Sequence, residues 1–150
     1  MMIKIIRTNS KNQDFIDLVG LLDADLAIKD GDEHFFYDQF NKIDHIKYVI
    51  VLYENDRLVG CGAIKEFDSQ TTEIKRMYVS EDNRGKGFAT MILTELEKWS
   101  HQLSFKRCVL ETGKKQVDAI GLYKKNNYNI IPNYGQYAEK ENSICFEKQI

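Results

Sequence analysis

The stretch EIKRMYVSEDNRGKGFA, residues 73–89, changes its hydrophobic period at its centre. Residues 71–79 alternate with a period of two, which predicts a strand. From residue 88 onward, apolar residues recur at helical spacing, which predicts a helix to about residue 100. A polar loop, 80–84, and two glycines lie between them. The sequence therefore predicts a strand, a glycine-bearing loop and a long helix in direct succession.

The two periods assign faces to these elements. The period of two places Glu73, Lys75, Met77 and Val79 on one face of the strand, and Ile74, Arg76 and Tyr78 on the other. The helix presents an apolar face made of Phe88, Ala89, Ile92, Leu93, Leu96 and Trp99.

The glycine-bearing loop is typical of an anion site. Gly85 and Gly87 allow the backbone to approach a ligand closely, and the first N–H groups of the following helix have no internal partner. Arg84 and Lys86 add positive charge. This arrangement predicts a bound phosphate or pyrophosphate. The structural alternative is a helix start with solvated basic residues.

Two familiar phosphate motifs fit the loop poorly. A P-loop requires Ser or Thr after the lysine, where this chain has Gly87. A dinucleotide fingerprint lacks its third glycine, and five residues separate the strand from the glycines. Glu111 stands at about the distance of a ribose-binding acid, so a dinucleotide site stays a minor alternative.

The remaining patterns predict one α/β (α+β) domain, residues 1–150, with helices covering a mixed sheet. Further strands are predicted over 2–7, 47–53, 57–66, 106–112, 128–131 and 142–148. Helices are predicted over 11–27, 33–42 and 117–126. Ser10 and Gln13 have capping-box spacing at the first helix, and Asn127 suits a left-handed position after the last.

Composition excludes several classes of protein. The 150 residues have a net charge of −2, which is unlike a nucleic-acid-binding surface, and no apolar run is long enough for a membrane span. The N-terminus has no secretory pattern, so we expect a cytoplasmic protein. Cys61, Cys108 and Cys145 lie far apart in apolar stretches, which predicts buried free thiols. We expect no metal site.

Three segments together resemble the GNAT family of N-acetyltransferases. They are EIKRMYVSEDNRGKGFA, LETGKKQVDAIGLYKKNNY (110–128), and the C-terminal NIIPNYGQY with SICFEK. The last resembles a bacterial branch of the family whose acceptor the residues leave open. The resemblance implies a twisted, mostly antiparallel sheet in which strands 71–79 and 106–112 splay apart. Acetyl-CoA would lie in the gap.

The resemblance also implies roles for individual residues. Backbone groups of Met77, Tyr78 and Val79 would bind the pantetheine arm. Gln116 stands where many members have Asn, and Ala119 begins the Ala-x-x-x-Tyr element. Tyr123, which ends that element, would protonate the leaving CoA thiolate. The pyrophosphate would be wrapped by Arg84, Gly85, Lys86, Gly87, Phe88, Ala89 and Thr90.

Acetyl transfer to a primary amine requires a group that removes the amine proton. Glu73 and Glu111 both match positions where family members carry such a carboxylate, and we rank Glu73 slightly ahead. A backbone N–H near Val79 would donate a hydrogen bond that stabilises the negative charge developing on the thioester oxygen. The structural alternatives are salt bridges to Lys75 or Lys106 for the glutamates, and packing on the sheet for Tyr123.

We expect the acceptor to be a small amine or an amino-acid-like molecule, and two interpretations of its binding compete. Asp23 and Asp25 belong to an acidic segment that would attract a cationic amine. Arg76 would instead hold a substrate carboxylate. Tyr37, Tyr134 and Tyr137 are further candidates for the pocket wall. The oligomeric state stays open, with a homodimer among the alternatives.

Two other functions remain as rivals. Cys61 or Cys108 could form an acyl-enzyme with a histidine, although no nucleophile signature surrounds either residue. The chain could also bind acyl-CoA as a regulatory module without turnover. We expect direct transfer from acetyl-CoA in a ternary complex, without a metal.

Overall fold

A computed structural model describes residues 2–30 and 46–150, which form a seven-stranded sheet with the order β1-β2-β3-β4-β5-β7-β6. In this order β4 and β5 pair in parallel, and the other neighbours among the described strands pair antiparallel. The predicted fold class is therefore confirmed. The strands are β1 (Ile3–Thr8), β2 (Tyr48–Glu54), β3 (Arg57–Asp68), β4 (Thr71–Val79), β5 (Arg107–Gly113), β6 (Asn129–Ile131) and β7 (Ser143–Gln149).

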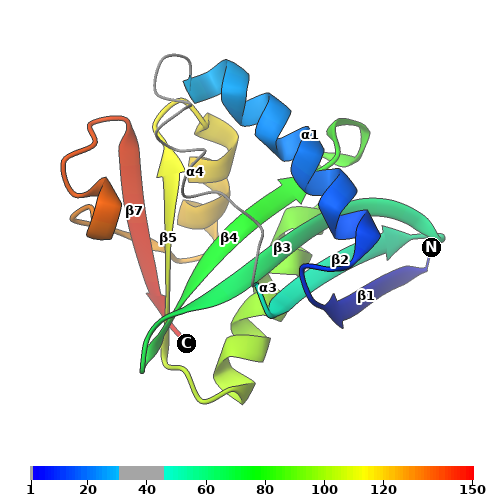
Figure 1. Ribbon diagram of the computed structural model, residues 1–150, viewed down its shortest axis with the longest axis horizontal. Coiled ribbons are helices and arrows are strands. Elements are labelled where there is room, and N and C mark those ends of the chain that lie inside the picture. Colours follow the sequence, from blue (N-terminus) through cyan, green and yellow to red (C-terminus); the bar gives the residue numbers. More distant parts are fainter. Residues whose placement is uncertain (1, 31–45) are drawn as a thin grey trace.

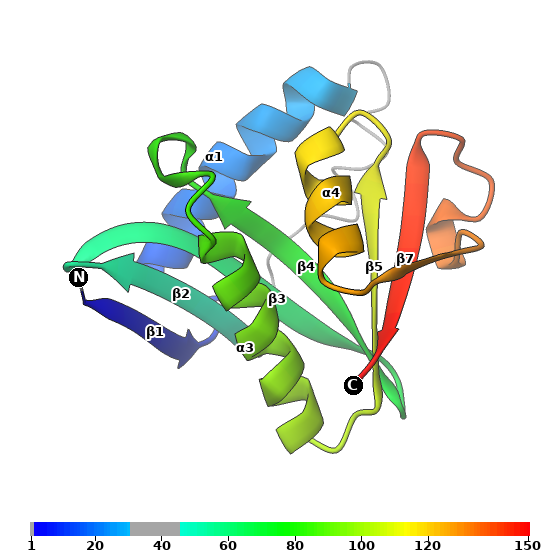
Figure 2. The ribbon, with the colours of Figure 1, turned by 180° about the vertical axis from the view of Figure 1, so that it is seen from behind.

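Helices cover both faces of this sheet. Helix α1 (Gln13–Asp30) crosses one face, as Figure 1 shows. Helices α3 (Phe88–Gln102) and α4 (Val117–Lys125) lie on the opposite face, which Figure 2 brings to the front. Each side has its own apolar core, built around Phe15 under α1 and around Ile92 and Leu96 under α3. The helix predicted over 33–42 lies outside the described residues, as does Tyr37.

Short polar signals explain where several elements begin and end. Asn55 and Asp56 join β2 to β3 with φ values of 50° and 66°, the left-handed pair that a tight hairpin requires. Asn127 follows α4 with a φ of 71°, as predicted. The predicted cap of α1 is wrong: the Asn12 side chain accepts a 3.0 Å bond from the Phe15 N–H, whereas the N–H of Ser10 donates to the carbonyl of Ile46.

A bulge in β4 overturns the predicted faces of that strand. Lys75 pairs with Ala63 and Tyr78 with Cys61, so Arg76 and Met77 together lie opposite one residue of β3. Arg76 has a φ of 60°, an uncommon value for a residue other than glycine. An extra residue reverses the alternation beyond it. Ile74, Met77 and Val79 therefore pack towards α3, while Glu73, Lys75, Arg76 and Tyr78 share the α1 face.

The two parallel strands separate soon after they meet. Residues of β4 and β5 pair from Thr71–Arg107 to Glu73–Val109, and the ladder ends there. β5 continues to Gly113 with β7 as its partner, and β4 continues to Val79 with β3 as its partner. The carboxyl halves of the two strands consequently diverge, which is visible in Figures 1 and 2. This divergence positions the candidate site.

Candidate active site

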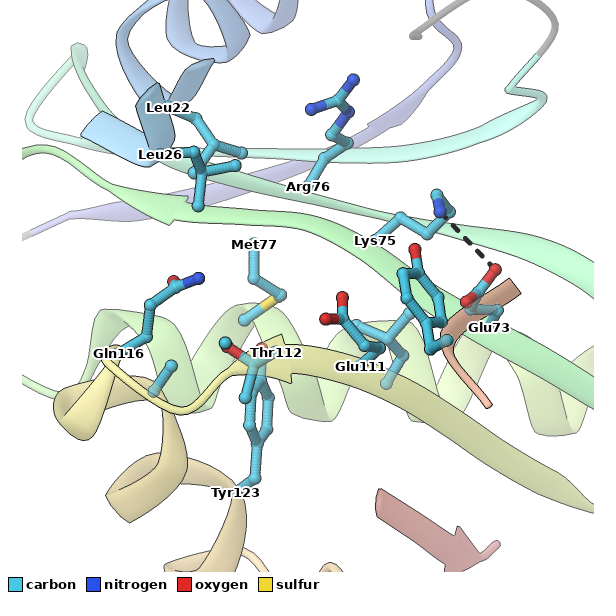
Figure 3. A pocket seen from close by; sticks show the side chains of 14 residues that line it. Leu22, Leu26, Glu73, Lys75, Arg76, Met77, Glu111, Thr112, Gln116 and Tyr123 are labelled. Atoms are coloured by element: carbon cyan, nitrogen blue, oxygen red, sulfur yellow. Dashed lines mark ion pairs between the residues drawn. The ribbon is translucent and has the colours of Figure 1, made fainter. Parts of the chain in front are cut away.

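A cavity lies where β4 and β5 separate, bounded by α1 on one side and α4 on the other (Figure 3). Residues that are distant in the sequence meet in this cavity. Among the predicted site residues, Glu73 and Tyr137 both line it although they are 64 positions apart. The predicted residues in its wall are Glu73, Arg76, Met77, Glu111, Gln116, Ala119, Tyr123 and Tyr137. The wall also contains residues that the sequence did not predict, namely Leu22, Leu26, Ile74, Lys75, Thr112 and Gly113.

Tyr123 enters the cavity from α4. Its side chain points towards the gap between the two strands (Figure 3), and only 6% of the residue is exposed. The ring packs against Tyr128 and Phe146, with centroid distances of 5.8 Å in both cases. Burial, reinforced by the negative charge of Glu111, raises the pKa of Tyr123 above its ordinary value of 10.0. Tyr123 is therefore a protonated hydroxyl at neutral and mildly alkaline pH.

The two candidate carboxylates have different surroundings. Glu73 is 8% exposed; its Oε2 accepts a 2.7 Å hydrogen bond from the hydroxyl of Tyr134, and its Oε1 lies 3.6 Å from Nζ of Lys75. Glu111 is half-buried on β5. Burial, followed by the negative charge of Glu111, raises the pKa of Tyr123 and of Tyr137, and all three residues line the cavity.

The aspartates proposed for an acidic mouth already have cationic partners. Asp23 accepts a 3.0 Å hydrogen bond from Nη1 of Arg76, whose side chain is 2% exposed. Asp25 pairs with Lys29 one helical turn away, at 3.1 Å. Both aspartates lie outside the residues that line the cavity. The charge that α1 offers to a cationic acceptor is thus partly neutralised within the protein.

The loop before α3 has the conformation that its glycines predict. Gly85 and Gly87 have φ values of 76° and 86°, and a Cβ added at either would point into open space. Gly87 directly precedes the first turn of α3, whose N–H groups lack partners within the helix. This open, glycine-lined helix start fits a diphosphate group. Arg84, by contrast, donates from its Nε to the carbonyl of Val79 at 2.8 Å and stacks near the Tyr78 ring.

The other predicted contacts lie along the same edge of β4. Tyr78 packs with the core beneath α1, while Val79 is buried in the core beneath α3. Their side chains therefore diverge, and only their backbone borders the region beyond the end of the β4–β5 ladder. Thr90 lies on α3, and its hydroxyl accepts a 3.4 Å bond from the side chain of Asn126, the residue that directly follows α4.

Burial makes the cysteines poor nucleophiles. Cys61, Cys108 and Cys145 are each 0% exposed. Burial raises the pKa of Cys61 to about 12 and that of Cys145 to about 11, and it also raises the pKa of Cys108. A thiol is reactive as its thiolate, and these pKa shifts suppress the thiolate at neutral pH.

Two kinds of feature are absent from the residues that the structure describes. Within 2–30 and 46–150, no helix combines the length and hydropathy needed to span a membrane. The same ranges contain no group of three or more His, Cys, Asp or Glu residues placed to hold a metal ion.

Comparison with known proteins identifies relatives across most of the chain. The sequence profile described as the acetyltransferase (GNAT) family matches residues 16–128. The uncharacterized N-acetyltransferase YsnE of Bacillus subtilis is 32% identical over 100 residues, which cover 65% of this chain and 66% of YsnE. Matches to the curated relatives span 37–67% of their lengths.

Solved structures share the fold over the whole chain. A Klebsiella pneumoniae protein, provisionally assigned as an acyl-CoA N-acyltransferase, superposes with a TM-score of 0.83 at 25% identity, covering 99% of this chain and 97% of the other. A GNAT family acetyltransferase from Elizabethkingia anophelis, crystallised with acetyl-CoA bound, has a TM-score of 0.70 at 17% identity. That match covers 99% of this chain and 98% of the other.

Proposed function

The chain belongs to the acetyltransferase (GNAT) family, and from this premise we propose that it transfers an acetyl group from acetyl-CoA to a primary amine. The amine attacks the thioester directly, while both substrates are bound. The observation that carries this proposal is the cavity between β4 and β5, where the hydroxyl-bearing ring of Tyr123 and the carboxylate of Glu111 line one space.

Acetyl-CoA fits the groups along this gap. The open backbone at Gly85 and Gly87, followed by the start of α3, would hold the diphosphate. The edge of β4 from Met77 to Val79 would bind the pantetheine arm, with Gln116 and Ala119 opposite it on the α4 side. The acetyl-CoA-bound relative of the same fold supports this choice of cosubstrate.

The acceptor must lose a proton before it can attack. An amine with a pKa of about 10.4 is only ~0.04% neutral at pH 7, which corresponds to about 4.6 kcal/mol. Glu111 is better placed than Glu73 to accept this proton, although the sequence alone ranks Glu73 ahead. The negative charge of Glu111 contributes to the raised pKa of Tyr123, which lies beside the proposed leaving group, whereas Glu73 makes no such contribution.

Tyr123 then serves as the acid for the departing sulfur. Its raised pKa keeps the hydroxyl protonated, and its position in the cavity wall lets it face the thioester. A backbone N–H of β4 near Val79 would stabilise the negative charge on the thioester oxygen during attack. The buried, protonated cysteines support direct transfer over an acyl-enzyme route.

The acceptor enters from the α1 side of the cavity. Arg76 and Tyr137 contribute to its wall. Tyr134 is connected to the wall by the hydrogen bond that its hydroxyl donates to Glu73. These groups suit a small amine or an amino-acid-like molecule. Asp23 and Asp25 would influence the approach of the acceptor from outside the wall.

An amine-panel assay tests the proposal. Free CoA thiol is measured while wild-type protein and acetyl-CoA are incubated with amino acids, polyamines, aryl amines and lysine-bearing peptides, and mass spectrometry identifies the acetylated product. The proposal expects CoA release that depends on at least one amine and yields its N-acetyl product. CoA binding in a thermal-shift titration, without release for any amine, would instead indicate an acyl-CoA-binding module.

A further inference from the structure

The proposed acceptor pocket already contains a primary amine. Lys75 lines the same cavity as Tyr123 and Glu111, and its side chain is only 11% exposed. Lys65 offers a contrast one strand away: it is the Cα partner of Glu73 on β3 and is exposed to solvent. Lys75 is thus enclosed where the reaction would take place.

We propose that Lys75 is an acetylation site of this protein, modified by the acetyl-CoA bound in its own active site. This inference rests on the proposed acetyl transfer. The reaction competes with the external acceptor for the same thioester, and it proceeds when the acceptor is scarce.

The contacts of Lys75 permit this reaction. Its Nζ lies 3.6 Å from Oε1 of Glu73, a distance longer than a hydrogen bond, so the ammonium is loosely held (Figure 3). Glu73 is fixed by Tyr134 at 2.7 Å and provides a stationary proton acceptor beside the amine. The lysine nitrogen therefore has a carboxylate partner, as the external amine would have in Glu111.

The reach of the side chain is sufficient. Lys75 and Met77 line the same cavity, although the bulge at Arg76 directs their side chains to opposite faces of β4. A flexible four-carbon stem extends roughly 6 Å from the backbone. Rotation of this stem away from Glu73 can carry the nitrogen into the gap between β4 and β5, where the thioester would lie.

The chemistry balances without another reactant. The ammonium of Lys75 gives one proton to Glu73, and the neutral nitrogen attacks the thioester carbonyl carbon. A C–N bond forms and the C–S bond breaks. The CoA sulfur gains a proton from Tyr123, which recovers one from the nitrogen as the amide forms. The proton on Glu73 leaves to solvent, so the products are N-acetyl-Lys75, CoA and one released proton.

Acetylation would change the pocket in two ways. It removes the positive charge that faces Glu73, since an acetylated lysine is neutral. It also places an acetyl group within the cavity that Arg76 and Met77 line, where the acceptor would bind. The modified protein should therefore transfer acetyl groups to external amines more slowly.

The test follows modification of the protein itself. Wild-type protein is incubated with acetyl-CoA and no acceptor, and acetylation at each lysine is timed by peptide mass spectrometry. We expect Lys75 to be modified about tenfold faster than Lys65, at a rate per molecule that does not depend on protein concentration. Tyr123→Phe should slow the modification of Lys75 about tenfold without slowing that of Lys65.

Matched variants and a competitor complete the design. Lys75→Arg should remove the enclosed site while keeping its charge, whereas Lys65→Arg should leave modification of Lys75 unchanged. Excess free CoA should suppress acetylation of Lys75 alone. Equal rates at Lys75 and Lys65, or insensitivity to CoA and to Tyr123→Phe, would overturn the inference. If the wild-type protein acetylates external amines but Lys75 stays unmodified, the inference fails and the proposed function stands. If neither external amines nor Lys75 are acetylated, the inference and the proposed function both fail.

Discussion

Arg76 on β4 donates a 3.0 Å hydrogen bond from Nη1 to Oδ1 of Asp23 on α1. The bond spans the face of the sheet opposite α3, and it is possible because the bulge turns Arg76 towards α1. The arginine side chain is 2% exposed and the aspartate side chain is 39% exposed. A buried cation is thus held at the cavity wall by a carboxylate at the protein surface.

Asp23→Asn should lower the free energy of unfolding by about 1–2 kcal/mol, because the enclosed guanidinium loses a charged acceptor. Urea unfolding followed by circular dichroism measures the change. Asp25→Asn is the matched control on the same helix. Its pair with Lys29 is over a third exposed on both sides, so its loss should change stability by less than about 0.5 kcal/mol. Equal effects of the two substitutions would contradict this account of Arg76.

Tyr123→Phe should reduce kcat at least about tenfold and leave the dissociation constant for CoA nearly unchanged, because it removes an acid and keeps the ring. Steady-state kinetics and calorimetric titration with CoA measure the two quantities. Tyr128→Phe serves as the control: Tyr128 packs against the Tyr123 ring, but its hydroxyl donates to Glu97 at 2.8 Å. That variant should lose stability and retain kcat. An unchanged rate for Tyr123→Phe would exclude Tyr123 as the acid.

Glu111→Gln should lower kcat/KM at pH 7 by about a hundredfold. The difference from wild type should narrow as the pH approaches the pKa of the acceptor amine, about 10.4. The reason is that an amine needs no base once it is already neutral. Because the pKa of Tyr123 is raised, the wild-type rate should not fall on the alkaline side below about pH 10. Glu73→Gln, measured over the same pH range, should have the smaller effect. The reverse order would make Glu73 the base.

Stability should decline above about pH 8.5, where cysteines of the unfolded chain lose their protons. The folded chain retains those protons, since burial raises the pKa of Cys61 to about 12 and that of Cys145 to about 11. A thiol whose pKa is raised by folding contributes its full stabilisation of the folded state below the pKa of the unfolded chain. That contribution is lost as the pH rises from the unfolded-state pKa towards the folded-state pKa. The loss is about 1.4 kcal/mol per pH unit for each thiol.

Urea unfolding under reducing conditions at pH 8, 9 and 10 measures this decline. Cys61→Ala will change the stability at pH 8 by altering the packing, but the informative quantity is the slope. One fewer titrating thiol should make the slope shallower by about 1.4 kcal/mol per pH unit. Parallel slopes for wild type and variant would contradict the assigned burial of Cys61.

Local patterns were sufficient to predict most of the fold. Alternation, helical spacing and turn residues act within a few positions, so the strands, α3 and α4 lie close to their predicted ranges. The bulge at Arg76 is different, because nothing in residues 71–79 marks an extra residue. It lies opposite Gly62 of β3, where an added Cβ would meet Met77 and the α3 side chains Ile92 and Leu96 at 2.8–2.9 Å.

The candidate site was predictable to the extent that the GNAT resemblance supplied it. Tyr123, Glu111 and the glycine loop follow from motifs that are continuous in the sequence. The hydrogen bond from Tyr134 to Glu73 joins residues 61 positions apart, and no local pattern reports such a contact. Lys75 was considered only as a partner for Glu73, because its enclosure in the cavity depends on where β4 and β5 separate.

The central claim is that the backbone around Gly85 and Gly87 holds the diphosphate of CoA and places the sulfur beside Tyr123. A crystal structure of the protein grown with CoA tests it most directly. We predict phosphate oxygens within hydrogen-bond distance of N–H groups between residues 85 and 90, and the sulfur between Met77 and Tyr123. A diphosphate bound elsewhere, or a sulfur remote from the β4–β5 gap, would contradict the account.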